Sequence, residues 1–175
     1  MKKLLDDISI VNLGLYLGKT LIISDIHIGY EESLNKKGIL IPRTQFKDII
    51  QSLDLLFEKL KGKQINKIII NGDLKHEFGK ISETEWSHTL RLLDYLSKKC
   101  NKIILIKGNH DTILGPIAKK RNVTITDYEI IKDKLIIHGD KIPEESTLKN
   151  IKTIIIGHEH PAINLKGGTR VEKYK

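Results

Sequence analysis

The amino-acid sequence predicts an α/β layered domain. Short apolar runs rich in β-branched residues recur along the chain, and longer segments with helical periodicity separate the first three of them. Strand–helix–strand order at this spacing favours parallel strands joined by right-handed crossovers. The chain has 175 residues, a usual length for one domain, so we expect residues 1–175 to form a single domain.

Five apolar runs are expected to be strands. Each is apolar on both faces, as strands are in a sheet that is covered on both sides. The runs are Thr20–Ser24, Lys67–Asn71, Lys102–Lys107, Lys134–His138 and Thr153–Gly157.

Two segments are expected to be amphipathic helices. In Arg43–Leu60 and again in Glu83–Lys99, apolar residues recur at intervals of three and four. Pro42 stands where a helix can begin. Ser82 followed by Glu85 three residues later predicts a capping box at the start of the second helix.

The second half of the chain has the pattern of antiparallel strands. Tyr128–Ile131 and Lys134–His138 flank a two-residue turn, which predicts a hairpin. Asn164–Lys166 and Thr169–Glu172 flank two glycines, which predicts another. We therefore expect an antiparallel stretch beside a mixed sheet.

The chain is basic, with a formal net charge of +8 and a sequence pI of about 9.4. Such a charge favours polyanionic partners such as nucleic acid. The lysines are scattered, however, and aromatic residues make up only 5% of the chain, so a charge that serves solubility alone is an equally good interpretation.

The single cysteine, Cys100, excludes an intrachain disulfide and a paired-cysteine metal site. The apolar run after Met1 is broken at Asp6 and is too short for a signal peptide or a membrane span. We expect a cytoplasmic protein without a membrane partner.

Each of the five predicted strands ends in a short polar signature. In an open α/β sheet, ligands bind outside the carboxyl ends of the strands, so these signatures are expected to converge on one site. They are Ser24-Asp25-Ile26-His27, Asn71-Gly72-Asp73-Leu74-Lys75-His76, Gly108-Asn109-His110-Asp111, His138-Gly139-Asp140 and Gly157-His158-Glu159-His160.

The residue types in the signatures indicate a metal site. Six of the seven histidines lie in them, and imidazole together with carboxylate suits Mn, Fe, Zn, Ni or Co. There are enough donors for two ions, and a carboxylate between two cations can bridge them. Each signature taken alone is more typical of a turn, a cap or a surface pair. Their joint occurrence at five strand ends favours the metal site.

The ordered set of motifs DxH, GD, GNHD, HG and GHEH resembles the calcineurin-like metallophosphoesterase superfamily, from Asp25 to His160. The resemblance implies a four-layer α/β/β/α sandwich of mixed sheets with a dinuclear centre. Two divalent ions are expected as cofactors, with Mn²⁺ the first choice and Fe, Zn, Ni or Co allowed.

The resemblance also implies roles for individual residues. Asp73 is expected to bridge the two metals, His110 to act as general acid, and Asp111 to orient His110. The other expected metal ligands divide into Asp25, His27 and His160 for one ion, and Asn109, His138 and His158 for the other.

Within the superfamily, the second block, GDLKHE, resembles the small phosphoesterases related to the nucleases SbcD and Mre11. His76 is expected to contact phosphate, as in that branch, although a surface position is the alternative. Only 15 residues follow His160, which leaves no room for a capping domain. Two alternatives stay open: the chain is a shortened form, or its second sheet is unusually small. A Rad50-like partner is therefore not expected. Relatives that accompany a DNA ligase and a helicase suggest DNA-processing proteins as partners.

The sequence is compatible with three functions. The first is hydrolysis of phosphodiester bonds in nucleic acid, and the alternative is a phosphodiesterase or phosphatase for small nucleotides or other phosphorylated small molecules. A non-catalytic scaffold is disfavoured because His110 and the ligand set are complete. The sequence leaves the substrate, the metal in vivo and the oligomeric state open.

Overall fold

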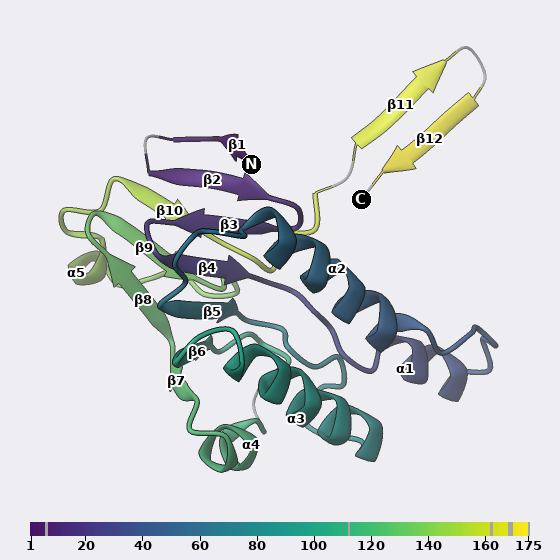
Figure 1. The fold of residues 1–175 in the computed structure, drawn as a ribbon. Coiled ribbons are helices and arrows are strands. Elements are labelled where there is room, and N and C mark those ends of the chain that lie inside the picture. The colour runs from purple at the N-terminus through teal and green to yellow at the C-terminus, as the bar shows by residue number, and fades with distance from the viewer. Residues whose placement is uncertain (6, 112, 162, 168–169, 175) are drawn as a thin grey trace.

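Figure 1 shows the computed structural model, which describes residues 1–5, 7–111, 113–161, 163–167 and 170–174. A seven-stranded mixed sheet forms its centre, in the order β1-β2-β3-β4-β5-β6-β7. Its strands are β1 (Lys2–Lys3), β2 (Ile8–Val11), β3 (Gly14–Leu17), β4 (Thr20–Ile23), β5 (Lys67–Asn71), β6 (Lys102–Ile106) and β7 (Thr124–Thr126).

A smaller sheet has three strands, in the order β10-β9-β8. Strands β8 (Tyr128–Ile131) and β9 (Lys134–Ile137) are the predicted hairpin, with Lys132 at φ 58° in its turn. Strand β10 (Thr153–Ile155) runs parallel to β9. The hairpin therefore belongs to a second sheet rather than to the edge of the first.

Figure 1 shows α1, α2 and α3 on one side of the seven-stranded sheet, and α5 on the opposite side, beyond β8 and β9. The helices are α1 (Tyr30–Lys36), α2 (Gln45–Lys59), α3 (Glu83–Ser97), α4 (Gly115–Lys120) and α5 (Glu145–Leu148). The layers are those of the expected sandwich. The outermost layer is only the single turn of α5 among the helices described, and it covers the three-stranded sheet.

Parallel strands β4 to β7 and the two long helices follow the sequence patterns closely. The capping box of α3 is confirmed, because Ser82 Oγ accepts from the Glu85 N–H and a Glu85 carboxylate oxygen accepts from the Ser82 N–H. The antiparallel strands β1 to β3 were not predicted. Strands β2 and β3 have four residues each, buried at both ends and half-buried between, so they show no alternating pattern, and Asn12 turns between them at φ 53°.

The second expected hairpin is formed by β11 (Ile163–Gly167) and β12 (Arg170–Tyr174), which pair antiparallel. Its predicted turn lies partly outside the described residues. In the part of the chain that is described, no helix combines the length and the apolar character needed to cross a membrane.

The apolar core has two parts, and they explain why the central strands are apolar on both faces. One part lies between the large sheet and the helices and includes Ile68, Ile70 and Leu92. The other part joins the two sheets and includes Ile69 and Ile136. Alternate residues of β5 thus enter different cores, which anchors its carboxyl end between the sheets.

Candidate metal centre

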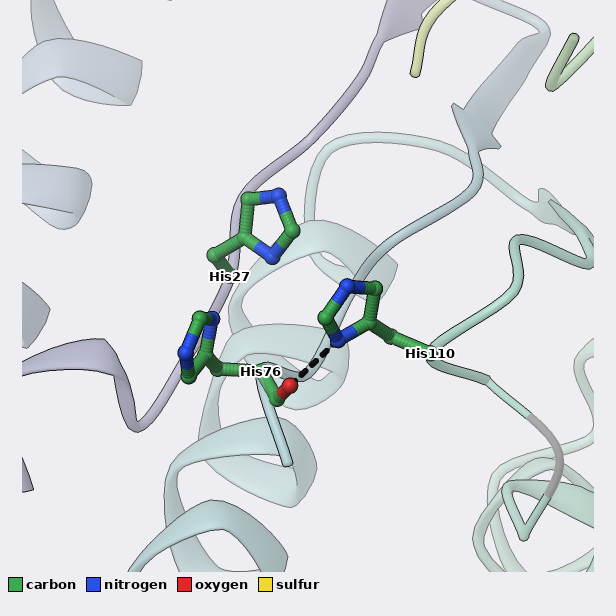
Figure 2. Close-up of side chains that lie close together, drawn as sticks. All are labelled: His27, His76 and His110. Atoms are coloured by element: carbon green, nitrogen blue, oxygen red, sulfur yellow. Dashed lines mark hydrogen bonds between the residues drawn. The ribbon is translucent and has the colours of Figure 1, made fainter. Parts of the chain in front are cut away.

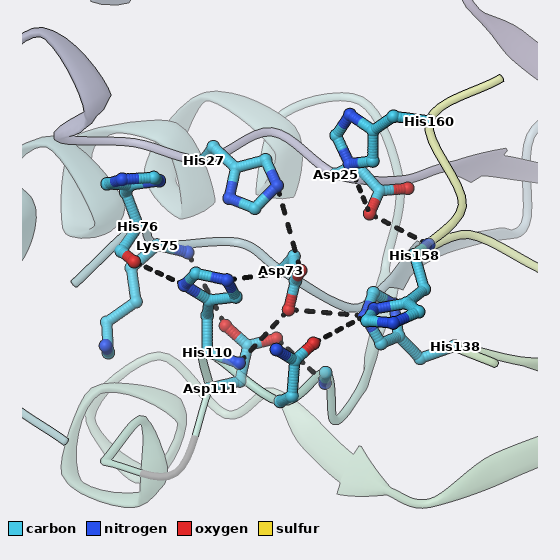
Figure 3. Close-up of polar contacts among 12 residues, drawn as sticks. Asp25, His27, Asp73, Lys75, His76, His110, Asp111, His138, His158 and His160 are labelled. Atoms are coloured by element: carbon cyan, nitrogen blue, oxygen red, sulfur yellow. Dashed lines mark hydrogen bonds and ion pairs between the residues drawn. The ribbon is translucent and has the colours of Figure 1, made fainter. Parts of the chain in front are cut away.

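The five polar signatures come together at the carboxyl ends of strands from both sheets. One signature follows each of five strands, which are β4, β5 and β6 of the large sheet and β9 and β10 of the small sheet. Figure 3 shows side chains of all five signatures near one another. Main-chain hydrogen bonds link the neighbouring signatures. The Asp25 N–H donates to the Gly72 carbonyl at 3.2 Å, and the Gly157 N–H donates to the His138 carbonyl at 2.9 Å.

Four of the predicted metal ligands adopt left-handed backbone conformations. The φ angles are 52° at Asp25, 49° at His27, 49° at Asp73 and 61° at His158. Non-glycine residues seldom occupy this region, and each such residue costs of order 1–3 kcal/mol. The concentration of strain at these residues is typical of a functional site.

The first predicted ligand set is assembled. Donor atoms of Asp25, His27 and His160 all lie within 4.8 Å of one another, and His160 Nε2 is 3.6 Å from Asp25 Oδ1. Ser24 Oγ lies 2.5 Å from Asp25 Oδ2 and 2.7 Å from the Asn71 carbonyl oxygen, so its single hydroxyl proton has an acceptor on either side.

The second predicted set is also assembled. Donor atoms of Asp73, His138 and His158 lie within 4.8 Å of one another, and Asn109 Oδ1 is 3.2 Å from His138 Nε2. His138 Nδ1 donates to the Asn71 carbonyl at 3.0 Å, because a carbonyl oxygen can only accept. The Nε2 atom is therefore left to face the site, as outer hydrogen bonds commonly arrange for metal-ligating histidines.

Asp73 lies between the two sets and is only 2% exposed. One carboxylate oxygen, Oδ2, is 3.7 Å from His27 Nε2, and the other, Oδ1, is 3.3 Å from His138 Nε2. Neighbouring backbone approaches closely: a Cβ added at Gly108 would stand 2.5 Å from the Asp73 backbone nitrogen. The position of the Asp73 carboxylate thus depends on having glycine at position 108, just after β6.

The donor set fits a pair of divalent transition-metal ions. It combines imidazole nitrogens with carboxylate and amide oxygens, a mixture suited to Mn, Fe, Zn, Ni or Co. Burial lowers the pKa of His27 to about 4, with the Asp73 carboxylate opposing the shift, so this imidazole is neutral at pH 7 and has a lone pair for a metal. In His138 burial also lowers the pKa, but the Asp73 carboxylate outweighs it and raises the value to about 9.

His76 and His110 lie beside the first set, on the Oδ2 side of Asp73. Figure 2 shows the His27, His76 and His110 rings around one space, and their donor atoms lie within 4.8 Å of one another. His110 Nδ1 donates to the His76 backbone carbonyl, and His110 Nε2 is 3.8 Å from Asp73 Oδ2. The structure therefore brings His76 together with His27 and His110.

Asp111 is expected from the sequence to orient His110, and the hydrogen bonds of its carboxylate go to the backbone. The Asp111 carboxylate accepts from the backbone N–H groups of Gly108 at 3.1 Å and Leu74 at 3.0 Å. The His76 carbonyl orients the ring. Burial raises the pKa of Asp111 to about 6, although its backbone donors oppose the shift. Asp111 thus ties two signature loops together.

Two residues, Glu85 and Lys75, support the site through contacts that the sequence did not indicate. Glu85, fully buried, accepts from the His76 N–H at 3.0 Å and the Glu77 N–H at 2.8 Å, so the residue that caps α3 also holds the His76 loop. Lys75 is fully buried and its Nζ donates to the Glu77 carbonyl. The capping-box pattern located Glu85, but no local signal indicated its contact with this loop.

Comparisons with known proteins agree with this fold. A family model described as calcineurin-like phosphoesterase matches residues 18–162. A crystal structure of the nuclease MPE from Pseudomonas putida is similar with a TM-score of 0.65 and 20% identity, over 90% of this chain and 70% of that one. A protein of unknown function from Aquifex aeolicus has 25% identity over 81% of this chain and 78% of that one, with a TM-score of 0.49. A search of curated proteins finds no significant match.

Proposed function

The chain belongs to the calcineurin-like phosphoesterase family, and we propose that it is a dinuclear phosphodiesterase that acts on nucleic acid. Hydrolysis of phosphate esters with divalent metal ions follows from the family. The dinuclear ligand set and the nucleic-acid substrate are our proposals. The observation that carries the dinuclear set is the Asp73 carboxylate, whose two oxygens face two separate donor sets. The nucleic-acid substrate rests instead on the exposed aromatic side chains of Phe78 and Tyr30 and on the basic charge of the chain.

The proposed ligands are the seven residues expected from the sequence. Asp25, His27 and His160 would hold one ion, Asn109, His138 and His158 the other, and Asp73 would bridge them. Two bound ions would neutralise phosphate charge and lower the pKa of a water molecule, which is the chemistry they supply in two-metal hydrolases.

His110 would donate a proton to the departing oxygen. Its Nδ1–H is committed to the His76 carbonyl, so Nε2, on the Asp73 side, is the atom free to carry that proton. His110 is buried, with only 8% of the residue exposed, so its side chain lies within the site. His76, whose ring centroid is 5.5 Å from that of His110, would contact the phosphate.

Exposed aromatic side chains beside these histidines support a substrate that contains bases. Phe78, 60% exposed, lies with its ring centroid 3.6 Å from that of His110. Tyr30, 46% exposed, lies 4.9 Å from the His76 ring. Aromatic faces next to a phosphate site bind unpaired bases by stacking. The net charge of +8 further favours a polyanion.

Activity on a chromogenic diester tests the enzyme first. We expect the protein to hydrolyse bis-p-nitrophenyl phosphate with Mn²⁺ and to lose this activity with EDTA. Absence of turnover with Mn²⁺, Zn²⁺, Fe²⁺, Ni²⁺ and Co²⁺ would contradict the dinuclear phosphodiesterase.

Competition between substrates tests the nucleic-acid proposal. A labelled single-stranded oligonucleotide should be cleaved in preference to cyclic nucleotides, and its binding should weaken steeply with salt because phosphate contacts release counterions. Phe78→Ala should weaken oligonucleotide binding and leave bis-p-nitrophenyl phosphate hydrolysis nearly unchanged, whereas Leu40→Ala, at an 87% exposed site, should change neither. Binding that is insensitive to salt would favour a small-molecule substrate instead.

A further inference from the structure

A cavity of about 670 Å³ opens beside the candidate metal centre, and we call it the side cavity. Its volume is in the usual range for small-molecule sites, about 300–1,000 Å³. It lies between the carboxyl end of β6, the start of β8 and the segment from Asp140 to Thr147.

The side cavity adjoins the second donor set. Asn109 lines it and places its Oδ1 atom 3.2 Å from His138 Nε2, and the cavity-lining residues Ile137 and Asp140 stand on either side of His138 in the sequence. His110 lies instead on the Oδ2 side of Asp73. Figure 3 shows the His110 and His138 side chains on opposite sides of the Asp73 carboxylate. A phosphate held at the centre would therefore extend one substituent toward His110 and the other into the side cavity.

The cavity wall includes an exposed aromatic side chain together with aliphatic ones. Tyr128 is 40% exposed and is paired across the strands with Ile137. Ile142, 96% exposed, and Pro143 come from the loop after β9. An exposed aromatic side chain suits a nucleobase, which stacks through its π-face whatever its identity.

The charged groups of the wall disfavour a second phosphate. Three carboxylates line the cavity against two ammonium groups, so the lining carries one net negative charge in a chain of net charge +8. Lys107 is already paired, with Nζ 3.1 Å from Asp127 Oδ1. The remaining carboxylates can accept hydrogen bonds from hydroxyl and amino groups. The carboxylates are Asp127, Asp140 and Glu144, and the second ammonium group is that of Lys141.

We propose that the side cavity binds one uncharged nucleoside of the substrate, with its base on Tyr128. This inference rests on the proposed function. Because the cavity is on the side of the centre away from His110, this nucleoside keeps the phosphate after hydrolysis. The alcohol that leaves is the substituent on the His110 side.

Chromogenic esters that differ only in the retained group test the proposal. Thymidine 5′-p-nitrophenyl phosphate, thymidine 3′-p-nitrophenyl phosphate and methyl p-nitrophenyl phosphate all release p-nitrophenol, and kcat/KM is compared for the Mn²⁺-loaded protein. One thymidine ester should exceed the methyl ester, which retains no aromatic group, by about tenfold or more, the scale of one base–aromatic contact. Tyr128→Ala should remove most of that preference, and Tyr128→Phe should keep it.

Ile130→Ala is the matched control, since Ile130 lies two residues along β8, is 43% exposed and does not line the cavity. It should keep the thymidine preference. Equal kcat/KM for the three esters, or a preference that survives Tyr128→Ala, would overturn the nucleoside site while leaving the phosphodiesterase intact.

A binding measurement keeps the two proposals separable if none of the esters is hydrolysed. Calorimetry would then compare thymidine 5′-monophosphate and thymidine 3′-monophosphate with inorganic phosphate. Tighter binding of one nucleotide, lost in Tyr128→Ala, would support the nucleoside site even though the proposed activity had failed. Equal binding of nucleotides and phosphate would refute it.

Discussion

Replacing Gly108 with alanine should disable the candidate metal centre while leaving the protein folded. A Cβ at this position would be 2.5 Å from the Asp73 backbone nitrogen and closer still to its Oδ1 atom. Ordinary contacts need about 3.5 Å, so the ends of β5 and β6 must separate by about 1 Å. That movement would disturb the 3.1 Å hydrogen bond from His110 N–H to Asp73 Oδ1 and the 3.3 Å approach of His138.

The two consequences of this displacement differ in size. A shift of 1 Å at a reacting centre costs about 100-fold in rate, so kcat/KM for bis-p-nitrophenyl phosphate should fall by about that factor. Overpacking should lower the free energy of unfolding by about 1–3 kcal/mol, which is less than the total of about 5–15 kcal/mol that is usual for a domain. Urea unfolding should therefore remain cooperative, with a lower midpoint.

The matched control is Gly115→Ala at the start of α4, where an added Cβ meets nothing within 4 Å. It should retain both activity and stability. Metal content measured on both variants would show whether the centre is lost or only distorted. A Gly108→Ala protein with at least a third of the original kcat/KM would show that the tight approach to Asp73 is not required.

Two further substitutions test the residues around the centre. His110→Gln should keep the metal content but lower the rate of oligonucleotide cleavage by about 10²–10⁴-fold, because the leaving alcohol needs a proton. The rate with bis-p-nitrophenyl phosphate should fall much less. Equal losses on both substrates would refute the role of His110 as general acid. Asp111→Ala leaves the buried N–H groups of Gly108 and Leu74 without an acceptor and should lower the free energy of unfolding by about 2–3 kcal/mol, or Tm by roughly 5–10 °C. Thermal unfolding would measure this against Asp127→Ala, at a 74% exposed carboxylate, which should change little; equal Tm values would exclude the structural role of Asp111.

Local patterns in the sequence were sufficient to locate most of the elements that carry the site. The runs around Ile69 and Ile104 are apolar on both faces because their strands are covered on both sides, and that property is visible residue by residue. The capping box of Ser82 and Glu85 is likewise a local interaction. Polar signatures directly after such strands already predicted a convergent site, since parallel strands end at the same edge.

The contacts within the site depended on residues far apart in the chain. The Asp111 carboxylate accepts a hydrogen bond from the Leu74 N–H in the loop after β5, and the Glu85 carboxylate on α3 accepts one from the His76 N–H. Neither contact has a periodic or spacing signal. Each arises because the packing of helices and strands brings a buried carboxylate to backbone N–H groups that would otherwise lack an acceptor.

By itself, therefore, the sequence determined the α/β class, the central strands and the seven residues proposed as metal ligands. Only the tertiary structure decided that His138 and His158 come from a second sheet, that the Asp73 oxygens face two separate donor sets, and that a cavity lined by Tyr128 adjoins them. The physical reason is that strand pairing and periodicity act over a few residues. The packing of one sheet on another depends instead on apolar faces, such as those of Ile69 and Ile136, that the chain brings together only when it folds.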